Sequence, residues 1–336
     1  MPRFDDTVAA FQALLAPRGY GLRATDTKVV FKTPPFGTPI FAIPDVHLCD
    51  GQGGDIFLDG DPEKPKKLAA VLNAIKTYQA QHPMSSRAIQ LGDWFDIWRV
   101  VGNDPRDMTY GKIQNVVAFR EILDLDAQIG LAHAIGNHDA GFLNSLPDRR
   151  AAQPAFFRLG FWLGANVYAL HGHQSDIEPP PNSTFDQTAV WLATVIGRFV
   201  PGVTRFESYV DRLGTGAGIG RWLVDSLLQV REDPKPPPRA KDERNLPSTV
   251  KSGQFVQREK VNKLAGIAQR VGALQESNGR SADVIIVGHS HVPGAAWTDI
   301  SGKPVVVVDA GAWAYDQANL LLAADDTIAV FDVIRR

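Results

Sequence analysis

Apolar and polar positions divide this 336-residue sequence into stretches with two different periods. Residues 4–15 have the spacing of a short amphipathic helix, and Pro34-Pro35 with Gly37 predicts a linker after it. Apolar residues recur at helical spacing at 68–78 and again at 113–123. Strands alternating with these helices predict an α/β chain. The short apolar and β-branched runs that predict the strands lie at residues 39–44, 88–91, 131–135, 167–170, 284–287, 305–309 and 328–333.

The pattern changes between residues 175 and 280, where no convincing strand is found. The stretch 233–247 is rich in proline and charge, and we expect it to be flexible because it has little apolar surface to offset the entropy of ordering. We therefore expect an N-terminal helical extension (1–39), an α/β core (40–174 and 281–336) and an inserted helical cap (175–280). The helices expected in the cap lie at about residues 186–199, 204–213, 218–230 and 258–276.

Composition narrows the class of protein. A hydrophobic content of 44% allows a sizeable core, and a net charge of −2 with a pI near 6.4 gives no general reason to bind nucleic acid or an anionic membrane. The N-terminal segment is acidic where a secretory signal would be basic, and the most apolar stretch, near 188–200, is too short to span a bilayer. We expect a soluble, cytoplasmic protein. Cys49, the single cysteine, is expected to be a small buried hydrophobe.

Five short motifs, most of them directly after a predicted strand, contain six of the eight histidines. Strand ends can deliver side chains to one point, so this recurrence predicts a site for two divalent metal ions. The oxygen and nitrogen ligands, without a thiolate, suit Mn, Fe, Zn or Co. Two such ions would activate a bridging hydroxide and clamp both the attacking and the leaving oxygen of a displacement. The motifs are Asp45-Val46-His47, Gly92-Asp93-Trp94-Phe95-Asp96, Gly136-Asn137-His138-Asp139, His171-Gly172-His173 and Gly288-His289-Ser290-His291.

In this order the motifs resemble those of the calcineurin-like metallophosphoesterases, over about residues 40–336. The resemblance implies a four-layer α/β sandwich, with two β-sheets flanked by helices, and a phosphodiesterase or phosphatase activity. It also implies that Asp93 bridges the two ions. The first ion would be bound by Asp45, His47, Asp93 and His291, and the second by Asp93, Asn137, His171 and His289.

The resemblance further implies that Asp96 orients His138. Imidazole titrates near neutral pH, so His138 is the expected general acid for the leaving alkoxide. Asp139 is expected to hold backbone or a neighbouring side chain. His173 is expected either to contact the substrate phosphate or to support a metal ligand. Outside the ligand set, we expect His133 to be packed in the core, His82 to lie in a surface turn, and Trp94, Trp98 and Trp313 to pack in the core.

A narrower resemblance gives the main alternative. The first two motifs in their wider context, the stretch 309–313 and the helical insertion resemble the UDP-2,3-diacylglucosamine pyrophosphohydrolase branch, which would place a lipid-linked nucleotide under the cap and allow peripheral membrane contact. That branch typically has arginine at the position of His138 and an acidic residue at His173, so a general phosphodiesterase or phosphatase ranks first. A nuclease would need a basic groove, whereas Lys and Arg are scattered here. The complete ligand set disfavours a non-catalytic scaffold. The sequence leaves the oligomeric state open.

Overall fold

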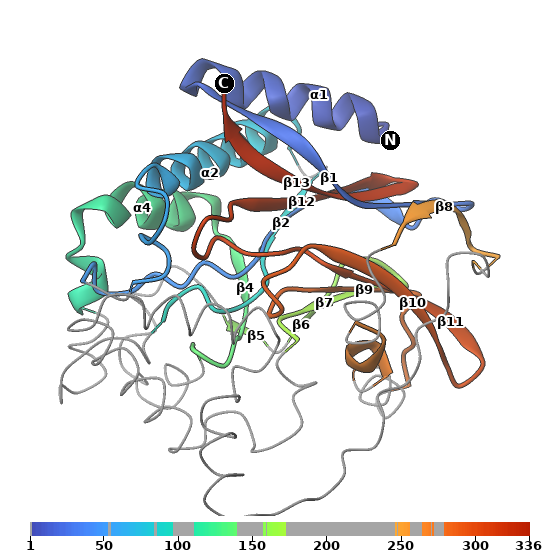
Figure 1. Ribbon diagram of the computed structural model, residues 1–336. Helices are drawn as coiled ribbons and strands as arrows, with labels where there is room; N and C mark the ends of the chain where they lie inside the picture. Colours follow the sequence, from blue (N-terminus) through green and yellow to red (C-terminus); the bar gives the residue numbers. More distant parts are fainter. Residues whose placement is uncertain are drawn as a thin grey trace, which may run out of the picture.

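The computed structural model of this chain is α/β, with two mixed β-sheets (Figure 1). It describes residues 2–52, 55–83, 86–96, 111–139, 157–158, 160–172, 246, 248–255, 264–269, 271 and 279–336. The expected cap helices at 186–199, 204–213 and 218–230 lie outside the described residues, as do His173, Trp98 and, apart from Leu246, the stretch 233–247. None of the described helices is long and apolar enough to cross a membrane.

The larger sheet has eight strands in the order β5-β4-β3-β2-β12-β13-β1-β8. Its half from β2 to β5 is parallel, and the strands from β12 to β8 are antiparallel. The strands are β1 (Tyr20–Phe31), β2 (Phe36–Ile43), β3 (Arg87–Gln90), β4 (Ala132–Ala134), β5 (Phe157–Arg158), β8 (Val250–Gln254), β12 (Asn319–Asp325) and β13 (Thr327–Arg335).

The smaller sheet has five strands in the order β10-β11-β9-β7-β6, with β11, β9 and β7 parallel. They are β6 (Gly160–Trp162), β7 (Val167–Leu170), β9 (Val284–Val287), β10 (Gly294–Ile300) and β11 (Lys303–Asp309). The helices are α1 (Phe4–Leu15), α2 (Lys64–Gln81) and α4 (Arg120–Ile129), with 3-10 turns η1 (Ala16–Arg18) and η2 (Val117–Phe119); residues 264–269 are also helical.

Alternating side chains bury both faces of each sheet. On β12, Leu320 and Leu322 pack toward α1, α2 and α4, whereas Leu321 and Ala323 face the smaller sheet. On β9, Val284 and Ile286 face the larger sheet, and Ile285 and Val287 pack against the helical segment formed by residues 264–269 and 271. The order is therefore helices, larger sheet, smaller sheet and helical segment, with α1, α2 and α4 together on one side in Figure 1. Strands buried on both faces read as continuous apolar runs, which explains why VIIV at 284–287 was recognisable.

The prediction of an α/β chain is confirmed, as are the helix at 4–15 and the helical spacing at 68–78 within α2. The single helix expected at 113–123 is divided, because Val116 is extended between a helical turn at 111–114 and η2. The segment 1–39, which we expect to be a helical extension, also contains the strand β1, which pairs with β13 inside the larger sheet. The polar run Arg23–Lys28 hides this strand in the sequence. The expectation of no strand between 175 and 280 is also wrong, because β8 forms the edge beside β1.

Candidate metal centre

The five motifs follow strands whose carboxyl ends meet between the two sheets. The first three come after the parallel neighbours β2, β3 and β4, and the last two after the parallel neighbours β7 and β9. Backbone bonds continue this pairing beyond the strands: the N–H groups of Val46 and His47 donate to the carbonyl of Asp93 at 3.0 and 2.7 Å, and the N–H of Gly288 donates to the carbonyl of His171 at 2.9 Å. The motifs are therefore held together by the sheets themselves.

The first ligand group consists of Asp45, His47, Asp93 and His291. Nε2 of His47 and Nε2 of His291 are 3.0 Å apart. Nε2 of His291 is 3.2 Å from Oδ2 of Asp45, and Nε2 of His47 is 3.8 Å from Oδ2 of Asp93. All four side chains are buried, and their nitrogen and oxygen atoms point to one place.

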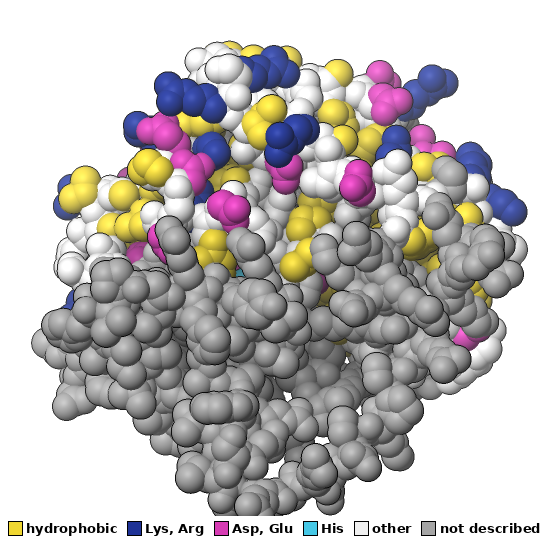
Figure 2. All heavy atoms as spheres, in the orientation of Figure 1, with side chains coloured by type: hydrophobic (Ala, Val, Ile, Leu, Met, Phe, Trp, Pro, Cys, Tyr) yellow, Lys and Arg dark blue, Asp and Glu magenta, His cyan; other side chains and the backbone are white. Residues whose placement is uncertain are grey.

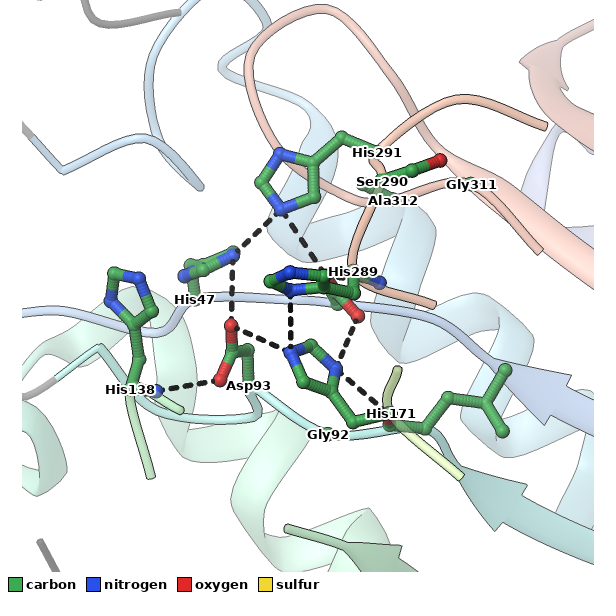
Figure 3. Close-up of polar contacts among 12 residues, drawn as sticks. His47, Gly92, Asp93, His138, His171, His289, Ser290, His291, Gly311 and Ala312 are labelled. Atoms are coloured by element: carbon green, nitrogen blue, oxygen red, sulfur yellow. Dashed lines mark hydrogen bonds and ion pairs between the residues drawn. The ribbon is translucent and has the colours of Figure 1, made fainter. Parts of the chain in front are cut away.

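The second ligand group consists of Asp93, Asn137, His171 and His289. Nε2 of His171 lies 3.0 Å from Oδ1 of Asn137, 3.1 Å from Nδ1 of His289 and 3.2 Å from Oδ2 of Asp93. Oδ2 of Asp93 therefore belongs to both groups, and Figure 3 shows this carboxylate between His47 and His171. Its other oxygen, Oδ1, accepts the backbone N–H of His138 at 2.8 Å.

These separations fit metal coordination. Two ligand atoms about 2.1 Å from one ion, and about 90° apart, lie about 3.0 Å from each other. The carbonyl of Leu91, 3.0 Å from Nδ1 of His171, can only accept, so Nδ1 carries a hydrogen, and loss of any second ring proton on metal binding would leave Nε2 with a lone pair. That lone pair faces oxygen atoms of Asn137 and Asp93. One shared proton could bond to only some of these atoms, whereas a divalent ion could be coordinated by all of them.

The electrostatics of the site agree with this geometry. In the described part of the chain, histidines alone form ion pairs with Asp45 and Asp93. Burial would raise the pKa of both carboxyl groups, but the surrounding imidazoles, His171 first among them, hold both values below the ordinary one. Burial would lower the pKa of His171, but Asp93 and Asp45 raise it well above its usual value. Buried carboxylates are stable only when paired or bound to metal, so these His and Asp groups could hold a metal ion.

Three motif glycines make room for these ligands. A Cβ added at Gly92 would lie 2.6 Å from the side chain of His171, one at Gly136 would lie 1.9 Å from Oδ1 of Asp93, and one at Gly288 would lie 2.3 Å from Oδ1 of Asp45. Real Cβ contacts are essentially never shorter than 3.0 Å. Each glycine therefore admits a ligand that comes from a different strand.

Four of the ligands have an uncommon backbone conformation. His47, Asp93, His289 and His291 have φ values of 60°, 50°, 65° and 56°. A residue with a side chain in this region costs of the order of 1–3 kcal/mol, and such residues concentrate where function requires an imposed geometry. The local strain falls on four of the seven proposed ligands, which indicates that the positions of these side chains matter more than local stability.

Asp96 connects the first ligand group to His138. Oδ1 of Asp96 is 2.8 Å from Nδ1 of His138, and Oδ2 of Asp96 is 3.3 Å from Nδ1 of His47. The carboxylate is fully buried, whereas His138 is 9% exposed. The rings of His47 and His138 meet edge to face with centroids 4.8 Å apart. One carboxylate thus contacts the outer nitrogen of a proposed ligand and a nitrogen of the proposed acid.

Most of the described residues around the ligand groups lie where the sequence predicts them. Asp139 accepts the backbone N–H groups of Trp94, Phe95 and Gly136, so it holds two motif loops together; burial raises its pKa to about 7. His133 is fully buried, Cys49 is buried in the core, and His82 is exposed at the end of α2. Trp94 and Trp313 are also fully buried in the core.

Gln90 contributes to the site but was missed. Its side chain binds the backbone of Gly92, one residue before Asp93. A glutamine at the end of a predicted strand carries no distinguishing signal, and only the alternation of side chains along β3 could have placed it inside.

No protein family model matches this chain, and no curated protein matches it.

Proposed function

We propose that this protein is a dinuclear metal-dependent phosphoester hydrolase, a phosphodiesterase or phosphatase of the calcineurin-like metallophosphoesterase type. The observation that carries the proposal is the position of Asp93, whose Oδ2 is shared by two groups of ligand atoms. A carboxylate oxygen in that position is what a bridging ligand between two ions requires. The stacking of helices, sheet, sheet and helical segment supports the four-layer sandwich of this family.

In this proposal, the first ligand group holds one ion and the second holds the other, with Asp93 common to both. When bound, the ions lower the pKa of a water molecule and neutralise charge on the phosphoryl oxygens. Burial lowers the pKa of His47, which favours the neutral imidazole that a metal binds. The first group carries two carboxylates and the second carries one carboxylate and an amide, so the first should bind its ion more tightly.

His138 is the proposed general acid. Its Nδ1 is engaged by Asp96, which leaves Nε2 as the atom that carries the proton toward the leaving oxygen. His138 is more exposed than His47, His171 and His291, which suits a group that must meet a substrate. Asp96 keeps the ring in the required tautomer and orientation.

The alternatives have less support. The lipid-linked nucleotide hydrolase depends on the insertion, whose predicted helices at 186–230 lie outside the described residues. For a nuclease, Figure 2 shows basic and acidic side chains interspersed over the described part of one face, without a continuous basic stripe there. Exposed pairs such as Arg18–Glu121 and Arg23–Asp332 illustrate the same mixture.

The test is hydrolysis by purified protein supplied with Mn, Fe, Co or Zn. Bis-p-nitrophenyl phosphate and p-nitrophenyl phosphate separate a diesterase from a monoesterase, and a parallel assay with UDP-diacylglucosamine addresses the lipid alternative. Asp93→Asn should abolish turnover and reduce the number of bound ions. Two bound ions without turnover on any of these esters would favour the scaffold, and no bound ion would remove the proposal altogether.

A further inference from the structure

A buried amide holds the backbone immediately before Asp93. Gln90, the last residue of β3, has no exposed surface. Its Oε1 accepts the N–H of Gly92 at 2.9 Å, and its Nε2 donates to the carbonyl of Gly92. One side chain therefore satisfies both backbone polar groups of a single residue, and the backbone groups fix which end of the amide is oxygen and which is nitrogen.

The peptide between Gly92 and Asp93 determines where the bridging carboxylate points. Gly92 has a φ of 105° and Asp93 a φ of 50°. Turning this peptide over by about half a rotation would return Asp93 to the negative φ that residues with a side chain prefer. The same rotation would carry the carbonyl of Gly92 away from Nε2 of Gln90. The hydrogen bond from Gln90 thus opposes the most accessible relaxation of Asp93.

The amide is itself held from behind by a second buried pair. Nδ1 of His133 lies 3.3 Å from Oε1 of Gln90, and Nε2 of His133 lies 3.1 Å from Oδ1 of Asp126 on α4. Both residues are fully buried, and the His133 ring packs edge to face on Trp94 with centroids 5.1 Å apart. A continuous series of contacts therefore runs from α4 through β4 and β3 to the loop that carries Asp93.

We propose that Gln90, braced by His133 and Asp126, is a positioning residue that keeps Oδ2 of Asp93 between the two ligand groups. The inference rests on the proposed two-metal function and adds a residue outside the five motifs. The same short segment also supports the second ligand group, because the carbonyl of Leu91 lies 3.0 Å from Nδ1 of His171. Gln90 acts through Asp93 and the backbone of Gly92.

The test compares Gln90→Met, which keeps the length of the side chain and removes both hydrogen bonds, with Gln12→Met. Gln12 is a matched control, since its Nε2 also donates to a backbone carbonyl, that of Leu22, far along the sequence from the motifs. Mn²⁺ titration calorimetry gives the number and affinity of ions, and electron paramagnetic resonance detects exchange coupling between two bridged Mn²⁺ ions. Loss of an outer support should weaken ion binding about 10- to 100-fold and reduce the coupling in Gln90→Met alone.

A readout without metal keeps this inference separate from the proposed function. The amide hydrogen of Gly92 should exchange slowly with solvent in the wild type and faster in Gln90→Met, with no ion added. Should that variant fail to fold, His133→Phe keeps the ring on Trp94, removes the contact with Gln90 and should weaken ion binding in the same direction. Two coupled ions of unchanged affinity in either variant would overturn the positioning role and leave the hydrolase proposal standing. A wild type that binds no ion pair would overturn the proposed function, and unchanged exchange of the Gly92 amide in Gln90→Met would overturn the positioning role.

Discussion

Gly288→Ala should disable the first ligand group through a single added methyl group. Gly288 lacks a positive φ, so alanine can adopt its backbone conformation. The new Cβ would lie 2.3 Å from Oδ1 of Asp45, and ordinary contact begins at 3.4 Å. The carboxylate must therefore move by about 1 Å, and a misplacement of that size in a reacting site costs about 100-fold in rate.

The effect should fall mainly on one ion. Oδ2 of Asp45 is held by the backbone N–H of His289 at 2.8 Å and lies 3.2 Å from Nε2 of His291, so displacement of the carboxylate disturbs the first group. Asp45 is not a ligand of the second group, which it contacts only through the backbone N–H of His289 and through Nδ1 of His171, at 3.3 Å from its Oδ1. We expect the first ion to bind about 10- to 100-fold more weakly, which is about 1.4–2.7 kcal/mol, while the second keeps most of its affinity.

Calorimetric titration with Mn²⁺ and the rate of diester hydrolysis measure these two effects. Gly164→Ala is the control, because its Cβ would meet only the carbonyl of Pro35 at 3.7 Å and its φ is likewise not positive. A folded Gly288→Ala protein that binds two ions as the wild type does, and turns over at the same rate, would show that Asp45 is not a ligand in the position described.

Three further substitutions test other parts of the site and fold. His138→Ala should leave the bound ions intact and lower turnover of alkyl phosphoesters by about 10²- to 10⁴-fold, with a smaller loss on p-nitrophenyl esters; unchanged alkyl ester turnover would exclude it as the acid. Asp96→Asn should lower turnover and also weaken binding of the first ion, since Asp96 contacts both His138 and His47. An unchanged ion affinity in calorimetry would restrict the role of Asp96 to its contact with His138. Burial lowers the pKa of Lys64 from 10.5 to about 8, so the unfolded chain binds more protons between these values and the free energy of unfolding should rise as pH increases from about 8 to 10.5, by at most about 1.4 kcal/mol per pH unit. Lys64→Met should lose that rise in urea unfolding at pH 8 and 10, and equal slopes would contradict the assignment.

The candidate ligands could be predicted because each one has a signal in its local sequence. His171 follows the apolar run of β7, and Asp93 follows that of β3, so residue type and strand end were both visible in the sequence. The structure brings these residues together with five others from distant stretches. Parallel pairing of the strands supplies the reason, since it aligns their carboxyl ends.

Features that depend on contact between distant segments could not be predicted in this way. The strand β1 is polar at Arg23–Lys28, because those positions lie where its register with β13 is interrupted and several side chains are exposed. The strand β8 has the sequence VKSGQ, which lacks a clear apolar alternation and is stabilised by pairing with β1. The contacts of the Gln90 side chain depend on the backbone turn at Gly92, which no local sequence pattern specifies.

The glycines show why the motifs belong together as a set. Gly92, in the second motif, leaves space for His171 of the fourth; Gly136, in the third, leaves space for Asp93 of the second; and Gly288, in the fifth, leaves space for Asp45 of the first. Each motif thus carries a ligand or a gap whose partner lies in another motif. A substitution at the end of one strand must therefore displace a ligand at the end of another, because the glycine and the ligand are in contact. The spacing within a motif therefore reflects its local turn, and the identity of its glycine reflects the ligand that a different motif brings to it.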